Sequence, residues 1–90
     1  MGYKIFLSRQ ADKFLSTQKK DIQVRINVLL TKLTEDAFPT SDYDIKKLQG
    51  LKHTFRIRLG DIRLIYEFIK EDQEINILKI DFRGSVYKNL

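Results

Sequence analysis

The stretch that most constrains the fold runs over residues 54–68 and reads TFRIRLGDIRLIYEF. Two runs of alternating apolar and polar residues flank the dipeptide Gly60-Asp61, and glycine tolerates the positive φ that a tight two-residue turn requires. The sequence therefore predicts an antiparallel β-hairpin with Leu59 opposite Ile62. A chain of 90 residues needs nearly all of its large apolar side chains in the core, so another element must cover the apolar side of this hairpin.

The register of the hairpin predicts which side chains share a face of the sheet. Pairing outward from the turn sets Arg58 opposite Arg63 and Arg56 opposite Ile65, and successive side chains point to opposite sides. The first face is apolar and is expected to pack against helices; it carries Phe55, Ile57, Leu59, Ile62, Leu64, Tyr66 and Phe68. The second face carries the three arginines, together with Ile65 and Glu67.

Three arginines on one sheet face have two interpretations. The commoner one is a solvated face that charge keeps soluble. However, the Cβ atoms of directly opposite residues lie ~5 Å apart, where two unit charges repel by roughly 0.8 kcal/mol even in water. A carboxylate would be more stable than Arg63 opposite Arg58, so the cluster favours an anionic ligand. Phosphate fits best, because guanidinium groups bind it through two parallel hydrogen bonds.

The remaining segments predict a small α+β domain. Residues 3–8 (YKIFLS) alternate as a first strand, Ser8 can cap a short helix, and a second helix is expected over Lys20–Glu35. The second helix has an apolar stripe made of Ile22, Ile26, Leu29, Leu30 and Leu33. A turn-rich loop then leads through IKKLQG to the hairpin, and residues 74–82 (EINILKIDF) form a further strand. We expect one domain, 1–90, of order β-α-α-β-β-β, with two N-terminal helices packed on one face of a small, mainly antiparallel β-sheet.

Composition excludes several classes of protein. The chain has no cysteine, which removes disulfides and thiolate zinc sites and fits a reducing cytoplasm. Its one histidine, His53, lacks carboxylates at metal-ligand spacing and is expected at the edge of the sheet, so we expect no metal and no cofactor. The start MGYKIFLSRQ lacks the apolar region of a signal peptide, and no apolar run approaches the roughly 18 residues of a membrane span. The net charge of +5 attracts polyanions such as nucleic acid or an acidic partner.

The segments KKLQG, FRIRLGDIRLIYEF and RGSVY together resemble the RelE/ParE superfamily of toxins from toxin-antitoxin systems. The resemblance covers nearly the whole chain, and its central motif RIRLGDIRLIY is typical of the superfamily rather than of one branch. RelE-like members enter the ribosomal A site and cut mRNA there, whereas ParE-like members inhibit DNA gyrase without cleaving RNA. The RelE-like branch implies a cytoplasmic, ribosome-dependent, metal-independent endoribonuclease that inhibits translation and is neutralised by a cognate antitoxin.

The resemblance also implies a set of catalytic residues: Arg56, Arg58, Arg63, Arg83 and Tyr87. The first two positions are lysines in the best-known RelE members, so the arginines here keep the charge but cannot supply a lysine proton. Tyr87 is the candidate general base, because a neighbouring arginine cluster can lower a tyrosine pKa from its ordinary value of about 10. Arg83 would stabilise the leaving group. The alternative for Tyr87 is an aromatic that anchors the end of the chain to the sheet.

Three lysines beside the hairpin have a weaker assignment. Lys46, Lys47 and Lys52 are candidate RNA-backbone contacts, and a plain charged edge that discourages aggregation explains them equally well. The implied partners are the ribosome, mRNA and an antitoxin that offers an acidic or helical segment, with no membrane involved. Two other functions fit the same residues: a ParE-like gyrase inhibitor that acts by binding, and a basic RNA-binding domain without catalysis.

Overall fold

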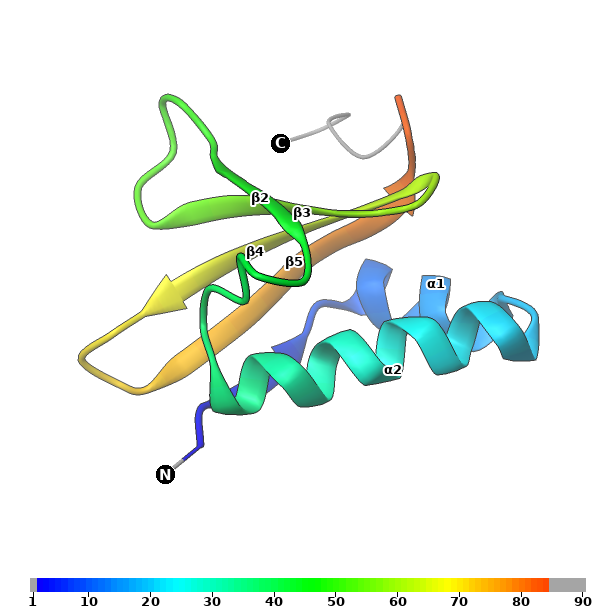
Figure 1. Cartoon of the computed structure of the whole chain (residues 1–90), viewed down its shortest axis with the longest axis horizontal. Helices are drawn as coiled ribbons and strands as arrows, with labels where there is room; N and C mark the ends of the chain where they lie inside the picture. Colours follow the sequence, from blue (N-terminus) through cyan, green and yellow to red (C-terminus); the bar gives the residue numbers. More distant parts are fainter. Residues whose placement is uncertain (1, 85–90) are drawn as a thin grey trace.

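The computed structural model describes residues 2–84 and contains two helices and five strands in that range. The elements are β1 (Lys4–Leu7), α1 (Arg9–Thr17), α2 (Lys20–Glu35), β2 (Asp44–Lys47), β3 (Thr54–Leu59), β4 (Ile62–Ile69) and β5 (Glu74–Phe82). Both helices lie on the same side of the sheet (Figure 1). The predicted α+β class and the bounds predicted for the second helix are confirmed. The sheet has one strand more than the predicted order, namely β2.

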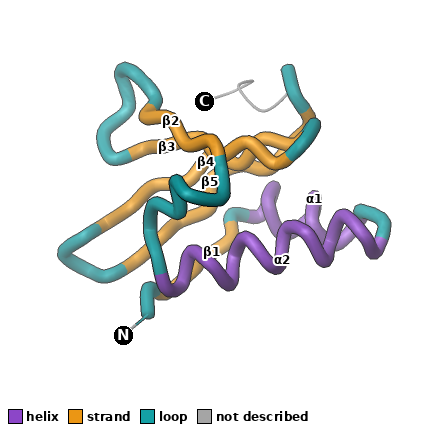
Figure 2. The backbone as a smooth tube through the Cα atoms, viewed as in Figure 1, coloured by secondary structure: helices purple, strands orange, loops and turns teal. Residues whose placement is uncertain are grey.

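The five strands form one sheet of order β1-β5-β4-β3-β2 (Figure 2). Neighbouring strands are antiparallel except β1 and β5, which are parallel. The predicted hairpin register is confirmed, with Leu59 opposite Ile62 and Arg58 opposite Arg63. The added strand β2 pairs with the outer side of β3 and sets Asp44 opposite Arg58. The four residues of β2, DIKK, carry too short a pattern to predict a strand from the sequence.

Helix α1 is attached to β5 by polar side chains. The Ser8 hydroxyl caps the helix by accepting from the Ala11 N–H at 3.1 Å, and it donates to the Leu78 carbonyl at 2.8 Å. Gln10 holds both backbone groups of Ile80, since its Nε2 donates to the carbonyl at 2.6 Å and its Oε1 accepts from the N–H at 2.9 Å. The β4–β5 register shifts between Ile65 and Tyr66. This irregularity leaves Leu78 as the extra residue of β5, and its carbonyl then serves the helix cap.

The core lies between the helices and the apolar face of the sheet. Helix α2 buries Ile26, Leu29 and Leu33, which belong to the predicted stripe. The remaining members of this cluster are Ala11, Phe14, Ala37, Ile57, Ile62, Leu64, Tyr66, Ile75, Ile77 and Ile80. The apolar side of the hairpin thus packs against the helices, as predicted. Within residues 2–84, neither helix has the length and apolar character needed to span a bilayer.

Candidate anion-binding site

Two rows of side chains lie on the face of the sheet that points away from the helices, which we call the arginine face. Each row consists of directly opposite residues on neighbouring strands, and such residues share a face. The first row, from β2 to β5, is Asp44, Arg58, Arg63 and Asp81. The second row is Lys46, Arg56, Ile65 and Lys79. Basic side chains therefore occupy the middle of the face, and a carboxylate stands at each end of the first row.

Arg58 is the accessible arginine of the three. Its side chain is exposed, and its cross-strand neighbours are Asp44 on one side and Arg63 on the other. Solvent weakens the repulsion between two like charges at this spacing. Arg58 is thus free to turn toward an anion that approaches the sheet.

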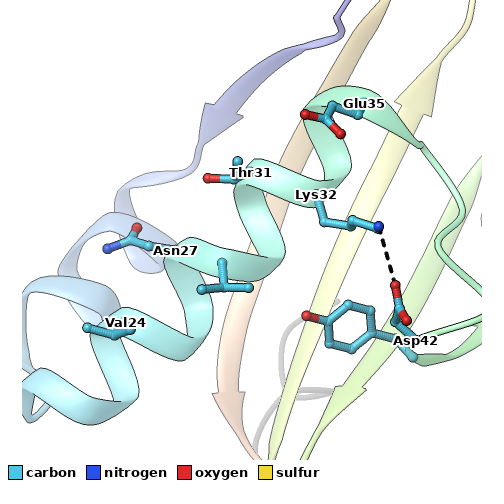
Figure 3. Close-up of a pocket in the computed structure, with 8 residues that line it drawn as sticks. Val24, Asn27, Thr31, Lys32, Glu35 and Asp42 are labelled. Carbon is cyan, nitrogen blue, oxygen red and sulfur yellow. Dashed lines mark ion pairs between the residues drawn. The ribbon is translucent and has the colours of Figure 1, made fainter.

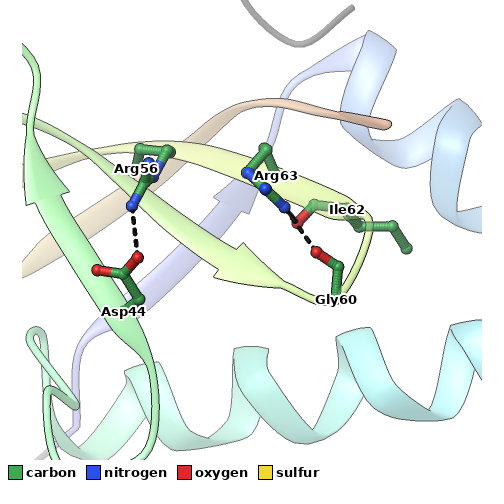
Figure 4. Close-up of polar contacts among 5 residues, drawn as sticks. All are labelled: Asp44, Arg56, Gly60, Ile62 and Arg63. Carbon is green, nitrogen blue, oxygen red and sulfur yellow. Dashed lines mark hydrogen bonds and ion pairs between the residues drawn. The ribbon is translucent and has the colours of Figure 1, made fainter. Parts of the chain in front are cut away.

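Arg63 is buried, with a relative exposure of 7%. Its Nη1 donates to the Gly60 carbonyl at 2.6 Å and to the Ile62 carbonyl at 3.2 Å, so the side chain folds back against its own hairpin turn (Figure 4). Both acceptors are neutral, so these two hydrogen bonds of Nη1 do not cancel the charge of the guanidinium. Charges out of contact with water are screened less than exposed ones, so the charge of Arg63 acts on its surroundings more strongly than that of an exposed arginine.

Arg56 is held by an ion pair within the sheet. Its Nη2 donates to Asp44 Oδ2 at 3.0 Å, and the side chain is 14% exposed against 46% for Asp44. Ile65, directly opposite Arg56, is fully buried although it lies on the outer face. The stems of long basic neighbours are able to cover such an apolar residue. Figure 4 shows Arg56 directed toward β2 and Arg63 toward the hairpin turn, so the two guanidinium groups diverge.

Of the two C-terminal candidates, one lies in the described part of the chain. The Arg83 N–H donates to the Asp61 carbonyl at 2.8 Å, which places Arg83 beside the hairpin turn. This is the same end of the sheet as Arg58 and Arg63, and the Arg83 side chain is exposed. Tyr87 lies outside the described residues. Its predicted role as general base stays a prediction.

The three lysines separate onto different surfaces. Lys46 lies opposite Arg56 and so belongs to the arginine face, whereas Lys47 lies opposite Phe55 and points to the other side. Lys47 and Lys52 instead border an open hollow of about 640 Å³ formed by the loop between β2 and β3. The structure therefore brings only Lys46 of the three together with the arginines.

His53 lies in the turn before β3, exposed and with a φ of 56°. His53 is thus exposed at the start of a strand that has β2 on one side and β4 on the other, so the predicted position at the edge of the sheet is not confirmed. Within the described part of the chain, no three side chains of the types that bind metals come together.

A groove between α2 and the loop before β2 was not anticipated from the sequence. It has a volume of about 760 Å³ and is lined by Val24, Val28 and Tyr43 among others, with the Lys32–Asp42 ion pair at 3.4 Å on its border (Figure 3). Val24 and Val28 are 52% and 57% exposed. The one feature of the sequence that could have indicated this groove is the pair of valines four residues apart, which lies outside the buried stripe of α2. No arginine of the arginine face lines this groove.

Comparisons with known proteins found relatives that match nearly the whole chain. No protein-family model matches the chain. A curated protein named "Putative toxin RelE1", from Methanocaldococcus jannaschii, is 36% identical over 89 residues, which are 99% of each chain. The RelE chain in the crystal structure of the archaeal RelE-RelB complex from Pyrococcus horikoshii OT3 superposes with a TM-score of 0.84 at 32% identity, covering 93% of this chain and 98% of that one.

A further solved structure supports the fold alone. The crystal structure of the RelB-RelE antitoxin-toxin complex from Methanococcus jannaschii matches with a TM-score of 0.78 at 22% identity. The match covers 94% of this chain and 98% of the other. The two chains therefore share the same fold over nearly their whole length.

Proposed function

The chain belongs to the RelE family of toxins from toxin-antitoxin systems, and we propose that it is a ribosome-dependent mRNA endoribonuclease that inhibits translation. One observation carries the proposal: the hairpin register gathers Arg56, Arg58 and Arg63 on the face of the sheet that the helices leave uncovered. RNA cleavage through the 2′-hydroxyl develops negative charge on the phosphate. Fixed guanidinium groups are suited to stabilise that charge.

The proposed mechanism divides the work between charge and proton transfer. The 2′-hydroxyl gives its proton to the Tyr87 phenolate and attacks the adjacent phosphorus in line, which forms the O2′–P bond. The P–O5′ bond breaks, and the departing 5′-oxygen takes a proton from water, which leaves a 2′,3′-cyclic phosphate. Arg58 and Arg63 stabilise the charge on the phosphate oxygens, each donor contributing about 10²- to 10³-fold. Arg83, beside the hairpin turn, stabilises the charge on the departing oxygen. The chain's own residues are proposed to supply this chemistry without a metal.

Dependence on the ribosome follows from the weakness of this acid-base set. A tyrosine is a poor base near neutral pH, so a large part of the acceleration has to come from holding the RNA in the reactive geometry. The ribosomal A site is proposed to provide that positioning. We expect free RNA to be cut poorly.

An antitoxin is the second proposed partner. The two matched structures are complexes of RelE with RelB, and the one from Methanococcus jannaschii is described as an antitoxin-toxin complex. An antitoxin could neutralise this chain by covering the arginine face or by displacing the segment that carries Tyr87. An acidic or helical peptide suits a basic sheet face.

The test maps mRNA 5′ ends in a translation extract after addition of wild type, Tyr87→Phe or Arg58→Gln. Wild type is expected to produce cuts at the A site, and each variant should lose about 10²-fold or more of that activity. Arg58 is exposed, so its loss should leave the fold intact. Lys13→Gln serves as the control, because it removes one exposed charge from α1 and should leave the cuts unchanged.

Three results would redirect the assignment. Unchanged cutting by Tyr87→Phe removes Tyr87 from the role of base. Inhibition of DNA supercoiling without mRNA cuts favours the gyrase inhibitor instead. RNA binding without cuts by any variant, including wild type, favours the non-catalytic RNA-binding domain.

A further inference from the structure

We infer that Asp44 competes with RNA phosphate for Arg56 and thereby sets how tightly the arginine face holds its substrate. The inference rests on the proposed function in one respect, namely that the anion is an RNA phosphate. The site is the first residue of the edge strand β2 together with the first of the two arginines of β3. In this proposal Asp44 controls the affinity for RNA and takes no part in the chemistry.

The contact between the two side chains resembles an arginine–phosphate contact with a carboxylate in place of the phosphate. Arg56 Nη2 and Asp44 Oδ2 are 3.0 Å apart, which is a hydrogen-bonded ion pair. A phosphodiester group offers two anionic oxygens in a geometry that a guanidinium fork can take through two nitrogens. The carboxylate of Asp44 therefore holds a nitrogen of Arg56 that a phosphate oxygen would otherwise take.

The present pairing leaves Arg56 incompletely satisfied. Its Nε is buried and donates to no acceptor in the part of the chain that the structure describes. A buried donor without an acceptor is unfavourable, because it has lost its hydrogen bonds to water and gained none. A guanidinium that swings out to a phosphate returns this N–H to an acceptor. Release from Asp44 thus removes one unfavourable feature of the free chain.

The exposure of Asp44 makes the exchange feasible. Its side chain is 46% exposed, and it stands at the beginning of a strand that has a neighbour on one side only. Ion pairs with a partner in solvent contribute little to stability, so a stronger anion can displace the carboxylate. Asp44 also lies directly opposite Arg58. The same carboxylate therefore weakens the attraction of two arginines for phosphate.

The test measures how tightly the purified full-length chain binds a 2′-O-methyl RNA tetranucleotide, which cannot be cleaved because its 2′-oxygens are blocked. The Kd is measured by isothermal titration calorimetry in every variant, and the NMR signal of the Arg56 Nε–Hε group is followed in the proteins that keep Arg56. Asp44→Asn is expected to lower the Kd about three- to fivefold, the range of an exposed ion pair. In an Arg56→Gln background, the same substitution should have a smaller effect.

Asp81→Asn is the matched control. Asp81 stands at the other end of the first row, opposite Arg63, and its Oδ1 accepts from the Phe82 N–H at 2.8 Å. The Asp81→Asn substitution changes the charge of the arginine face by the same amount as Asp44→Asn and leaves the ion pair of Arg56 intact. The proposal requires Asp44→Asn to tighten binding more than Asp81→Asn does.

The contrary results are distinct. Equal tightening by both variants would mean that net charge alone acts, and weaker binding by Asp44→Asn would mean that Asp44 orients Arg56 for the substrate; either overturns the proposal. An Arg56 signal that RNA does not move, in wild type and in Asp44→Asn, also overturns it. If the Asp44 effect is present but translation extracts show no A-site cuts, the proposed enzyme activity is wrong while the competition for Arg56 stands.

Discussion

The three arginines on this sheet differ in exposure and in hydrogen bonding because their neighbours differ. Arg58 is exposed, Arg63 is buried against two carbonyls, and Arg56 is paired with a carboxylate. Tyr66, on the opposite face, is a further polar residue that is fixed by its surroundings. It is fully buried, and its hydroxyl donates to the Ala37 carbonyl at 2.7 Å, which ties the segment after α2 to the sheet.

The ionisation of Tyr66 gives a prediction for alkaline pH. Burial, and secondarily the charge of Asp36, raise the pKa of Tyr66 well above its ordinary range. The folded chain then holds the proton more tightly than the unfolded chain, whose tyrosine titrates near pH 10. This contribution to stability is complete below pH ~10 and is lost above it, by up to about 1.4 kcal/mol per pH unit.

Urea unfolding of wild type and Tyr66→Phe between pH 9 and about 11 measures this effect. The variant should be less stable at pH 9 by about 1 kcal/mol, the value of a lost hydrogen bond. Its disadvantage should shrink as the pH rises, because phenylalanine has no proton to lose. A gap between the two proteins that stays constant over this range contradicts the assignment.

The elements differ in how they are held in place. The hairpin β3–β4 follows from its own turn and alternation, whereas α1 depends on contacts with a strand some 70 residues away in the sequence. Ser8 serves both purposes at this junction, since it caps α1 and donates to Leu78 on β5. The irregularity of β5 at Leu78 is what presents that carbonyl.

Ser8→Ala is expected to lower the free energy of unfolding by about 1 to 2 kcal/mol, because it removes the cap and the bond to the sheet together. Ser16→Ala is the matched control. The Ser16 hydroxyl donates to the Lys13 carbonyl in an exposed position of the same helix, and its loss should change stability by less than about 0.5 kcal/mol. Equal values from the two variants, measured in urea, would show that the junction at Ser8 is unimportant.

The two faces of the sheet have different roles in the whole molecule. The helices and the apolar side of the sheet make the core, and the other side of the sheet carries the arginines. The chain as a whole has a net charge of +5, so any polyanion is attracted to it. Position on the sheet, rather than net charge, should decide which basic residues contact RNA.

The salt dependence of RNA binding tests that separation. Each phosphate contact to a single strand adds about 0.7 to the slope of log K against log salt concentration. Arg58→Gln should reduce the slope by about this amount over roughly 50 to 200 mM salt. Lys13→Gln, with the same charge change on α1, should leave the slope unchanged. A reduction of the same size in both variants would assign binding to net charge alone.

Three features could be predicted from the sequence alone: the hairpin register, the bounds of α2 and the side of the sheet on which the three arginines lie. These features depend on turn chemistry and on the alternation of neighbouring residues, which are local properties. The assignments of catalytic roles to Arg56, Arg58, Arg63, Arg83 and Tyr87 remain predictions, since they came from the resemblance and no measurement tests them.

The contacts of each arginine, by contrast, depend on how separate elements pack in the folded chain. The pairing of Asp44 with Arg56 joins residues twelve apart and exists because β2 docks on the edge of β3. The burial of Arg63 depends on how its side chain folds back over the turn, and the position of Leu78 depends on the register of two strands. Such contacts arise from the packing of separate elements, and the period of a single segment contains no information about them.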